Sequence, residues 1–92
     1  MEQPRDLAAL KSAIASRLIA LSDHHHRIAR VAFERPEVIA FGTASSVAAL
    51  FAVSPSTVIR LTKALGFVRF RDFRTLFREH LRRAAAGRRA IL

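Results

Sequence analysis

Apolar residues recur at the three- and four-residue spacing of an α-helix along nearly the whole 92-residue chain. No stretch shows the strict alternation of apolar and polar residues that is typical of a half-buried strand. Half of the residues are hydrophobic (51%), and there are only three Gly and three Pro. This length and balance favour one folded domain. We therefore predict an all-α fold, a compact bundle of five to six helices that contains a helix-turn-helix.

Capping and breaking residues divide the first half of the pattern. Residues 4–22 predict an amphipathic helix with Leu7, Leu10, Ile14, Leu18 and Leu21 on its apolar face. Asp23 is the predicted N-cap of a second helix over 24–34, with Ile28, Val31 and Ala32 inside. A short third helix is expected over 36–41, because Pro36 suits a first helical position and Gly42 suits the end.

The second half predicts three further helices. Thr43 or Ser45 is expected to cap a helix that carries Val47, Ala48, Leu50 and Phe51. After a break at 52–53, Ser54 and Pro55 restart a helix that Gly66 closes. Following a turn over 67–71, Asp72 is the predicted cap of a last helix that ends near Gly87, with Phe70, Phe73, Phe77 and Leu81 as its core row.

Positive charge is concentrated in the second half of the chain. Sixteen basic and seven acidic residues give a net charge of +9. Residues 1–42 hold six basic and five acidic side chains, a balance of +1, whereas residues 43–92 hold ten and two, a balance of +8. A surplus of this kind indicates a polyanionic partner.

Residues 44–65 have the length and pattern of a DNA-binding helix-turn-helix. Ala48 is small enough for two helices to touch, and Val58 and Leu61 can pack back on Val47, Phe51 and Val53. Ala52 stands where Gly is often found, so a left-handed backbone there would be mildly strained.

A turn of about 100° per residue splits the second of these two helices into two arcs. The inner arc holds Val58, Leu61, Thr62 and Leu65, the outer arc holds Ser56, Thr57, Arg60, Lys63 and Ala64, and Ile59 lies at the boundary. Ser54, Ser56 and Thr57 could bind phosphates or base edges near the helix start, where free amides and the helix dipole favour an anion. Arg60 could bridge guanine O6 and N7, and Lys63 suits a phosphate. An ordinary N-cap at Ser54 is compatible with this function, and for Thr57 and Arg60 the alternative is a solvated helix face.

The segment from Val53 to Phe67, VSPSTVIRLTKALGF, closely resembles the motif V-S-x-x-T-V-x-R-[FL]-x-K-x-L-G-[FY] of RpiR-type transcriptional regulators. Residues 69–74 match the family's next element, G-[FY]-x-x-[FL]-[KR], except that Arg69 replaces Gly. Residues 21–29 and 35–37 resemble its upstream stretches, with His26 in place of an acidic residue, and Phe51 replaces a commonly small residue in the first helix of the motif.

This resemblance implies a dimeric, cytoplasmic DNA-binding domain over residues 1–87. Residues 88–92 would begin a linker to a sugar-isomerase-type effector domain that binds a phosphosugar and lies outside this chain. The implied role is regulation of sugar or sugar-phosphate metabolism through a double-stranded operator. The predicted DNA contacts are Ser54, Ser56, Thr57, Arg60, Lys63 and, in addition, Arg69.

Several other functions are not expected. With no Cys, the chain can form no disulfide or thiolate metal site. His24, His25 and His26 are consecutive, so no two share a helix face as metal ligands would. We expect no cofactor and no enzyme, because paired carboxylates, a nucleophile with a base and a phosphate-binding glycine loop are all lacking. No apolar run approaches the length of a membrane span, so a soluble protein without a membrane partner is expected.

Two questions stay open at this point. Arg71, Arg74, Arg78 and Arg82 form one row on the last helix, which could follow a DNA backbone or be solvated surface beside a further domain. The chain could also be a basic helical module whose amphipathic last helix binds a membrane surface or an acidic partner. RNA binding is a weaker variant, because exposed aromatic residues are not expected.

Overall fold

Six helices form the described part of the chain, which in this computed structural model comprises residues 3–16 and 19–91, with side chains as far as residue 87. They are α1 (Leu7–Ala15), α2 (Asp23–Glu34), α3 (Pro36–Ala40), α4 (Ala44–Phe51), α5 (Pro55–Ala64) and α6 (Phe70–Ile91). No strand occurs in these ranges. The predicted all-α class and helix number are confirmed.

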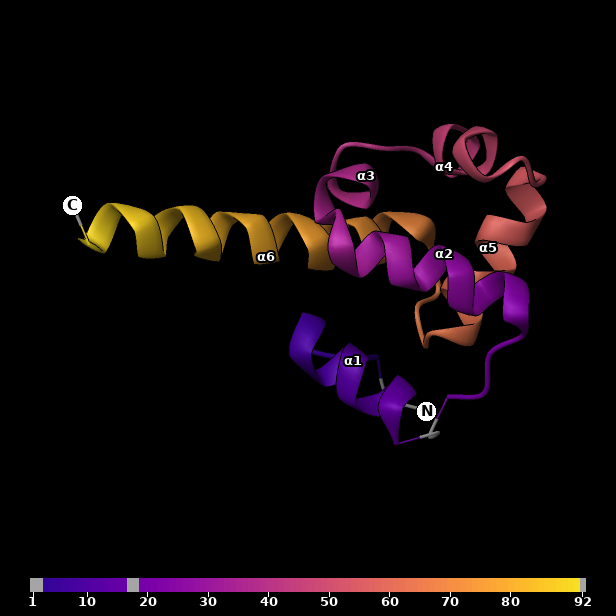
Figure 1. Ribbon diagram of the computed structural model, residues 1–92, viewed down its shortest axis with the longest axis horizontal. Helices are drawn as coiled ribbons and strands as arrows, with labels where there is room; N and C mark the ends of the chain where they lie inside the picture. The colour runs from indigo at the N-terminus through magenta and orange to yellow at the C-terminus, as the bar shows by residue number, and fades with distance from the viewer. Residues whose placement is uncertain (1–2, 17–18, 92) are drawn as a thin grey trace.

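The long helix α6 organises the molecule. It runs along the longest of the three dimensions, 42 × 28 × 20 Å, and the other helices gather around its N-terminal half (Figure 1). α3 packs on α6 along the middle of the body, while α4 and α5 lie at the end opposite the C-terminus. Beyond Leu81 the helix leaves the body, and the side chains from Arg82 to Gly87 are exposed. The α4–α5 pair therefore lies at one end of the molecule, and the exposed part of α6 lies at the other.

A chain of aromatic rings forms the centre of the core. The ring centroids of Phe67 and Phe73 are 5.4 Å apart, those of Phe73 and Phe77 5.0 Å, and those of Phe77 and Phe33 6.3 Å. These are favourable separations for aromatic pairs. The predicted core row of α6 is thus confirmed at Phe70, Phe73 and Phe77, which are buried, and Leu81 is half-buried.

The prediction of one helix over 4–22 was wrong in length. Asp6 caps α1 by accepting a hydrogen bond from the Ala9 amide at 2.8 Å, and α1 ends at Ala15. Leu7 and Leu10 are buried as expected, Leu21 lies beyond the helix, and Leu18 lies outside the described residues. Apolar spacing alone does not mark a helix end that no Gly or Pro accompanies.

The N-cap of α2 is Ser22, not Asp23. The Ser22 hydroxyl accepts from the His25 amide at 3.3 Å, and Asp23 becomes the first helical residue. Both residue types cap helices well, so the sequence does not separate them. An acid in the first turn still stabilises the positive end of the helix dipole. Of the predicted inner face, Ile28 and Ala32 are buried and Val31 is half-buried.

Both predicted ends of the last helix were wrong. The Arg69 carbonyl accepts from the amides of Asp72 and Phe73 at 3.1 and 3.3 Å, so α6 begins at Phe70 and Asp72 lies in its first turn. At the other end, the helix passes through Gly87 to Ile91. One interior Gly costs about 1 kcal/mol relative to Ala, which does not terminate a run rich in Arg and Ala.

Within the described residues, no individual helix combines the length and the hydropathy needed to cross a membrane. α4 and α5 reach those values only when they are taken together as one pair, which is sharply bent.

Candidate nucleic-acid interface

α4 and α5 cross at 107°, within the range of a DNA-binding helix-turn-helix. Thr43, rather than Ser45, caps α4. Its hydroxyl accepts from the Ser46 amide at 3.0 Å, and the Ser46 hydroxyl accepts from the Thr43 amide at 2.8 Å. This reciprocal capping box satisfies two amides at the helix start and fixes where α4 begins.

The turn between the two helices is closed by a left-handed residue. Ala52 has φ 55° and ψ 41°, as the sequence predicted for this position. The Val53 amide donates to the Ala48 carbonyl at 3.0 Å, and the Ala52 amide donates to the Ala49 carbonyl at 3.3 Å. This pair of bonds is a Schellman motif, which satisfies the last carbonyls of α4. The turn is thus held by the backbone despite the Cβ of Ala52.

The inner arc of α5 seats the helix on the core. Val58, Leu61, Thr62 and Leu65 are all fully buried. The Thr62 hydroxyl donates to the Val58 carbonyl at 2.9 Å, so this buried polar group has a partner. In α4, Val47 and Ala48 are also buried, whereas Phe51 is only half-buried and Leu50 is exposed. Val53, in the turn after α4, is half-buried.

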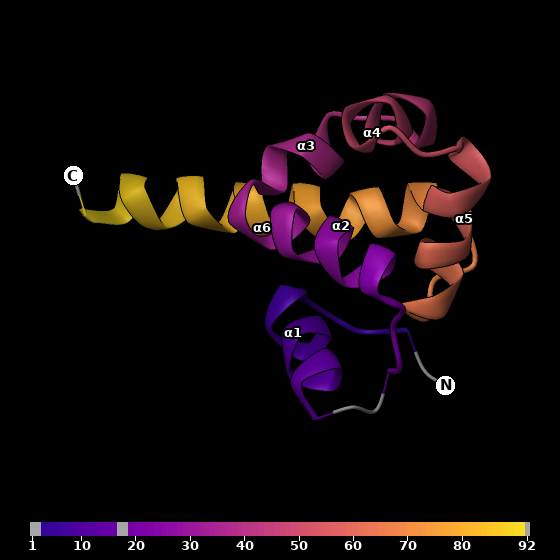
Figure 2. The ribbon, with the colours of Figure 1, turned by 45° about the vertical axis from the view of Figure 1, so that its right-hand side comes forward.

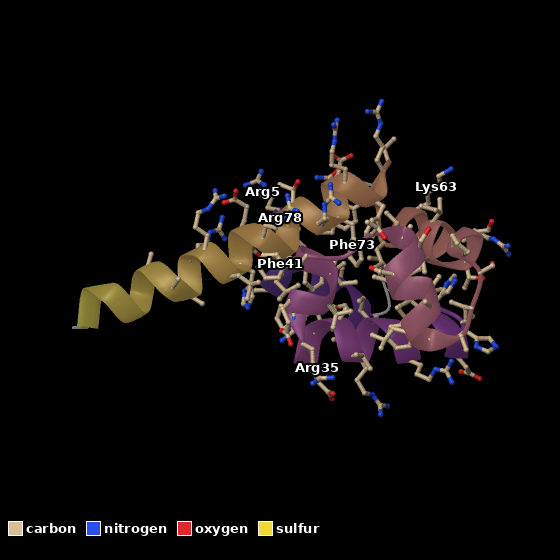
Figure 3. All side chains as sticks on the ribbon, turned by 90° about the horizontal axis from the view of Figure 1, so that it is seen from above. Arg5, Arg35, Phe41, Lys63, Phe73 and Arg78 are labelled. Carbon is tan, nitrogen blue, oxygen red and sulfur yellow. The ribbon has the colours of Figure 1, made fainter. Side chains whose placement is uncertain are left out.

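The outer arc of α5 faces solvent. Ser56, Arg60 and Lys63 are exposed, while Thr57 and Ala64 are half-buried. α5 lies at the edge of the molecule (Figure 2), and Lys63 projects away from the body whereas Phe73 lies inside it (Figure 3). Within the described residues, the side chains of Arg60 and Lys63 have no hydrogen-bond or ion-pair partner. The arrangement matches the predicted arc, and contact of these residues with DNA stays a prediction.

Ser54 and Thr57 are paired with each other at the start of α5. The Thr57 amide donates to the Ser54 hydroxyl at 3.3 Å, and the two hydroxyl oxygens are 3.1 Å apart. The predicted N-cap at Ser54 is confirmed. Because Pro55 has no N–H and the Thr57 amide is already bonded, the helix start offers an anion fewer free amides than expected. The two hydroxyls are nevertheless held at the surface beside Ser56.

Arg69 lies in the turn between α5 and α6. Its side chain is exposed, as is that of Val68 before it. The Arg69 carbonyl starts α6, so the backbone here is fixed by the helix that follows. The structure therefore places a sixth predicted contact on an ordered turn just after α5.

The positive charge of Arg60 acts on the pKa of His25, an effect that the sequence did not predict. The pKa of His25 is lowered from its ordinary value of 6.5, first by partial burial, then by the Arg60 guanidinium and then by His24. The two residues come from different helices, so no local pattern could show their proximity.

Among the described residues, no three His, Asp or Glu side chains are grouped so as to hold a metal ion.

The arginine row of α6 does not act as one surface. Arg78 donates through Nε to the Ala40 carbonyl at 2.7 Å, and Arg74 donates through Nη1 to the Gly42 carbonyl at 3.3 Å. Arg82 pairs with Glu79 at 3.1 Å, and Arg71 is exposed. Arg74 and Arg78 bind the protein's own backbone, a contact that the sequence did not predict, although Arg78 is otherwise exposed.

The burial of the Phe row also bears on the alternative of a membrane- or partner-binding last helix. That function requires the apolar face of the helix to be accessible. In α6 this face is buried, with Phe73 and Phe77 no more than 1% exposed. The folded chain therefore cannot use the predicted apolar face of α6 in this way.

Comparison with known proteins identifies the family. A family model described as "Helix-turn-helix domain, rpiR family" matches residues 8–84, from the first turn of α1 into the exposed part of α6. No curated protein matches the chain, and no solved structure does. The match covers most of the sequence and includes the whole α4–α5 pair. The chain therefore belongs to the rpiR family of helix-turn-helix domains, a family of DNA-binding transcription regulators.

Proposed function

We propose that this chain recognises a specific double-stranded DNA sequence by placing α5 in the major groove. In this arrangement Arg60 donates to a guanine edge, while Ser56 and Thr57 contact bases or phosphates near the start of the helix. Lys63, Ser54 and Arg69 bind phosphates and set the register of the helix on the duplex. The function is one of binding, and no catalytic step is assigned to any residue.

The division of α5 into a buried arc and an exposed arc carries this proposal. Four side chains of the inner arc hold the helix in place, so the outer arc has a defined orientation. A rigid helix loses little conformational entropy on binding, which favours sequence discrimination over loose attachment. The exposed Arg60 and Lys63 side chains are the charged groups that such a surface requires.

The charge distribution supports the same function. The balance of +8 lies in residues 43–92, in which Arg60, Lys63 and Arg69 lie on α5 and the turn after it, and the other seven basic residues lie on α6. Phosphate neutralisation releases counterions from DNA, so the logarithm of the affinity should fall linearly with the logarithm of the salt concentration. The expected slope is about −0.9 per phosphate contacted.

In vitro selection from random duplexes tests this proposal directly. The 92-residue chain should enrich one motif, and fluorescence anisotropy should then show salt-dependent binding that is much tighter for this motif than for a scrambled duplex. Enrichment of no motif, together with equal affinity for the selected and scrambled duplexes, would refute sequence-specific recognition. Salt-insensitive binding would refute contact with phosphates.

We further propose that the chain acts as a homodimer, and that a phosphosugar sets operator affinity only through a domain that is absent from this chain. The family resemblance supports both points, with residues 88–92 leading to an effector domain outside this sequence and a regulated pathway of sugar or sugar-phosphate metabolism. Two copies on one face of the duplex predict half-sites about 10 bp apart in the selected motif. A single unrepeated motif bound by one copy in sedimentation would contradict the dimer.

A further inference from the structure

Two arginines of α6 bind backbone carbonyls where α3 ends and the chain turns toward α4. The Arg78 Nε donates to the Ala40 carbonyl at 2.7 Å, and the Arg74 Nη1 donates to the Gly42 carbonyl at 3.3 Å. The last carbonyls of a helix have no partner within the helix, and they carry its negative dipole end. A guanidinium is therefore a favourable partner for them. Figure 3 shows Arg78 and Phe41 toward the side of the body from which α6 emerges, away from Lys63.

The segment held in this way leads directly into α4. Thr43, the N-cap of α4, follows Gly42 by one residue. The space around Gly42 is closed, because a Cβ there would collide with the Val38 carbonyl oxygen and would lie 3.3 Å from Val47 Cγ2. A connection this tightly packed has little freedom to change its path. Whatever fixes Gly42 relative to α6 therefore also fixes the start of α4.

We propose that Arg74 and Arg78 are positioning residues for DNA recognition. They attach the α3–α4 connection to α6, so that α4 starts at a fixed place and α5, which meets α4 at 107°, presents its outer arc at a fixed angle. They bind no DNA themselves. This inference rests on the proposed function, because the effect on affinity exists only if α5 reads a duplex.

The burial of Arg74 supports a role inside the protein, whereas Arg78 is exposed and its role rests on the hydrogen bond from its Nε to the Ala40 carbonyl. Arg74 is half-buried, and its Nε is fully shielded from solvent without a partner among the described residues. A side chain placed in this way is poorly suited to reach a phosphate. Arg82, on the same helix, is 74% exposed and forms only a surface pair with Glu79. It therefore provides a matched control in which the same charge is lost from α6 without loss of the anchor.

Two variants of Arg78 separate anchoring from charge. In Arg78→Gln the amide nitrogen stands as many bonds from the backbone as the arginine Nε, so the donor is kept and the charge is lost. In Arg78→Met the side chain is as long as that of glutamine but has no donor. Arg78→Met should weaken binding to the selected duplex about threefold to tenfold, as expected for one lost hydrogen bond, while Arg78→Gln stays near wild type. Arg74→Met should have a smaller effect in the same direction.

The slope of affinity against salt distinguishes this mechanism from phosphate contact. If Arg78 only anchors the α3–α4 connection, the slope of log affinity against log salt concentration is the same for Arg78→Met, Arg82→Ala and the wild type. Equal losses in Arg78→Gln and Arg78→Met, each with a slope reduced by about 0.9, would show instead that Arg78 binds a phosphate. Unchanged affinity in a folded Arg78→Met would show that the bond has no part in recognition.

Amide hydrogen exchange provides a measurement that does not depend on DNA. Arg78→Met should speed exchange in the first turn of α4 and at Gly42, and neither Arg78→Gln nor Arg82→Ala should do so. Unchanged exchange at these amides would overturn the anchoring role even if affinity fell. If the wild-type chain binds no duplex while exchange changes as expected, the proposed function fails and the anchor itself stands. If Arg78→Met does not fold, Arg74→Met is measured by the same two methods.

Discussion

α5 and α6 both carry basic side chains at helical spacing, but the structure uses them in opposite ways. Arg60 and Lys63 of α5 are exposed and have no partner within the described residues. Arg74 and Arg78 of α6 donate to carbonyls of the α3 end and its connection. The difference lies in the neighbouring element, because α3 presents carbonyls to α6 whereas the outer side of α5 faces solvent. The role of a basic residue is therefore decided by what packs against its helix.

This comparison also separates two kinds of rigidity. α5 is seated by apolar burial alone along its inner arc, with Thr62 satisfied within its own helix. α6 is held by its aromatic row on one side and by polar anchors to α3 on another. α5 thus uses no charged side chain for its own attachment to the core. Its two basic side chains, Arg60 and Lys63, remain exposed.

The largest predicted effect tests whether the aromatic row carries α6. Phe77 is fully buried and touches the rings of both Phe73 and Phe33. Phe77→Ala should lower the free energy of unfolding by about 3–5 kcal/mol, through lost burial and the cavity it leaves. Urea unfolding followed by circular dichroism measures this. Phe41→Ala, at a ring 75% exposed, is the control and should change stability by about 0.5 kcal/mol or less. Similar losses in the two variants would mean that the core is not organised around α6.

The second prediction compares the exposed cations of α5 with each other and with α6. Arg60→Ala should reduce discrimination between the selected and a scrambled duplex by about 1–3 kcal/mol, because a base contact is lost. Lys63→Ala should weaken both duplexes alike and lower the salt slope by about 1. Arg82→Ala should change neither quantity. Anisotropy titrations at several salt concentrations provide all three. If Arg60→Ala weakened both duplexes equally, Arg60 would be a phosphate contact rather than a base reader.

Much of the fold could be predicted from the sequence because its determinants are local. Apolar spacing located the helices, and Gly42, Ser54 and Pro55 marked their ends through backbone preferences that need no tertiary information. The split of α5 into two arcs followed from helix geometry alone, and the structure buries the predicted inner residues. The left-handed backbone at Ala52 agrees with its place at a turn position where Gly is often found.

The parts that could not be predicted depend on contacts between distant segments. Arg74 and Arg78 bind carbonyls 32 and 38 residues away, and nothing in the α6 pattern distinguishes them from Arg71. The proximity of His25 to Arg60 is of the same kind. The errors at Ser22 and Phe70 have another cause: several adjacent residues can start a helix at similar cost, and the final choice depends on how the chain enters it.

A smaller effect on stability is expected at Ala52, in the turn that joins α4 to α5. Ala52 is in the left-handed region, where Gly avoids the steric cost of a Cβ, so Ala52→Gly should stabilise the fold by about 0.5–1 kcal/mol. The control is the same change three residues earlier. Ala49→Gly, at an exposed helical position, should destabilise by about 1 kcal/mol. Thermal and urea unfolding should thus give opposite signs. The same sign for both would show that the turn at Ala52 is not left-handed in solution.

The smallest predicted effect concerns His25 and asks whether Arg60 truly faces α2. Removing the positive charge in Arg60→Ala favours the protonated imidazole, so the pKa of His25 should rise toward 6.5 while burial, the larger cause, still holds it below that value. Because the pKa is lowered only in the folded state, His25 contributes stability above about pH 6.5 that is lost as the pH falls through its folded pKa, and this loss should be smaller in Arg60→Ala. An NMR titration of the imidazole resonances measures the shift, and Lys63→Ala, which removes a charge from the same helix, should leave it unchanged. Equal shifts of the His25 pKa in the two variants would indicate a general effect of net charge. Arg60 would then be no closer to His25 of α2, in its electrostatic effect, than Lys63 is.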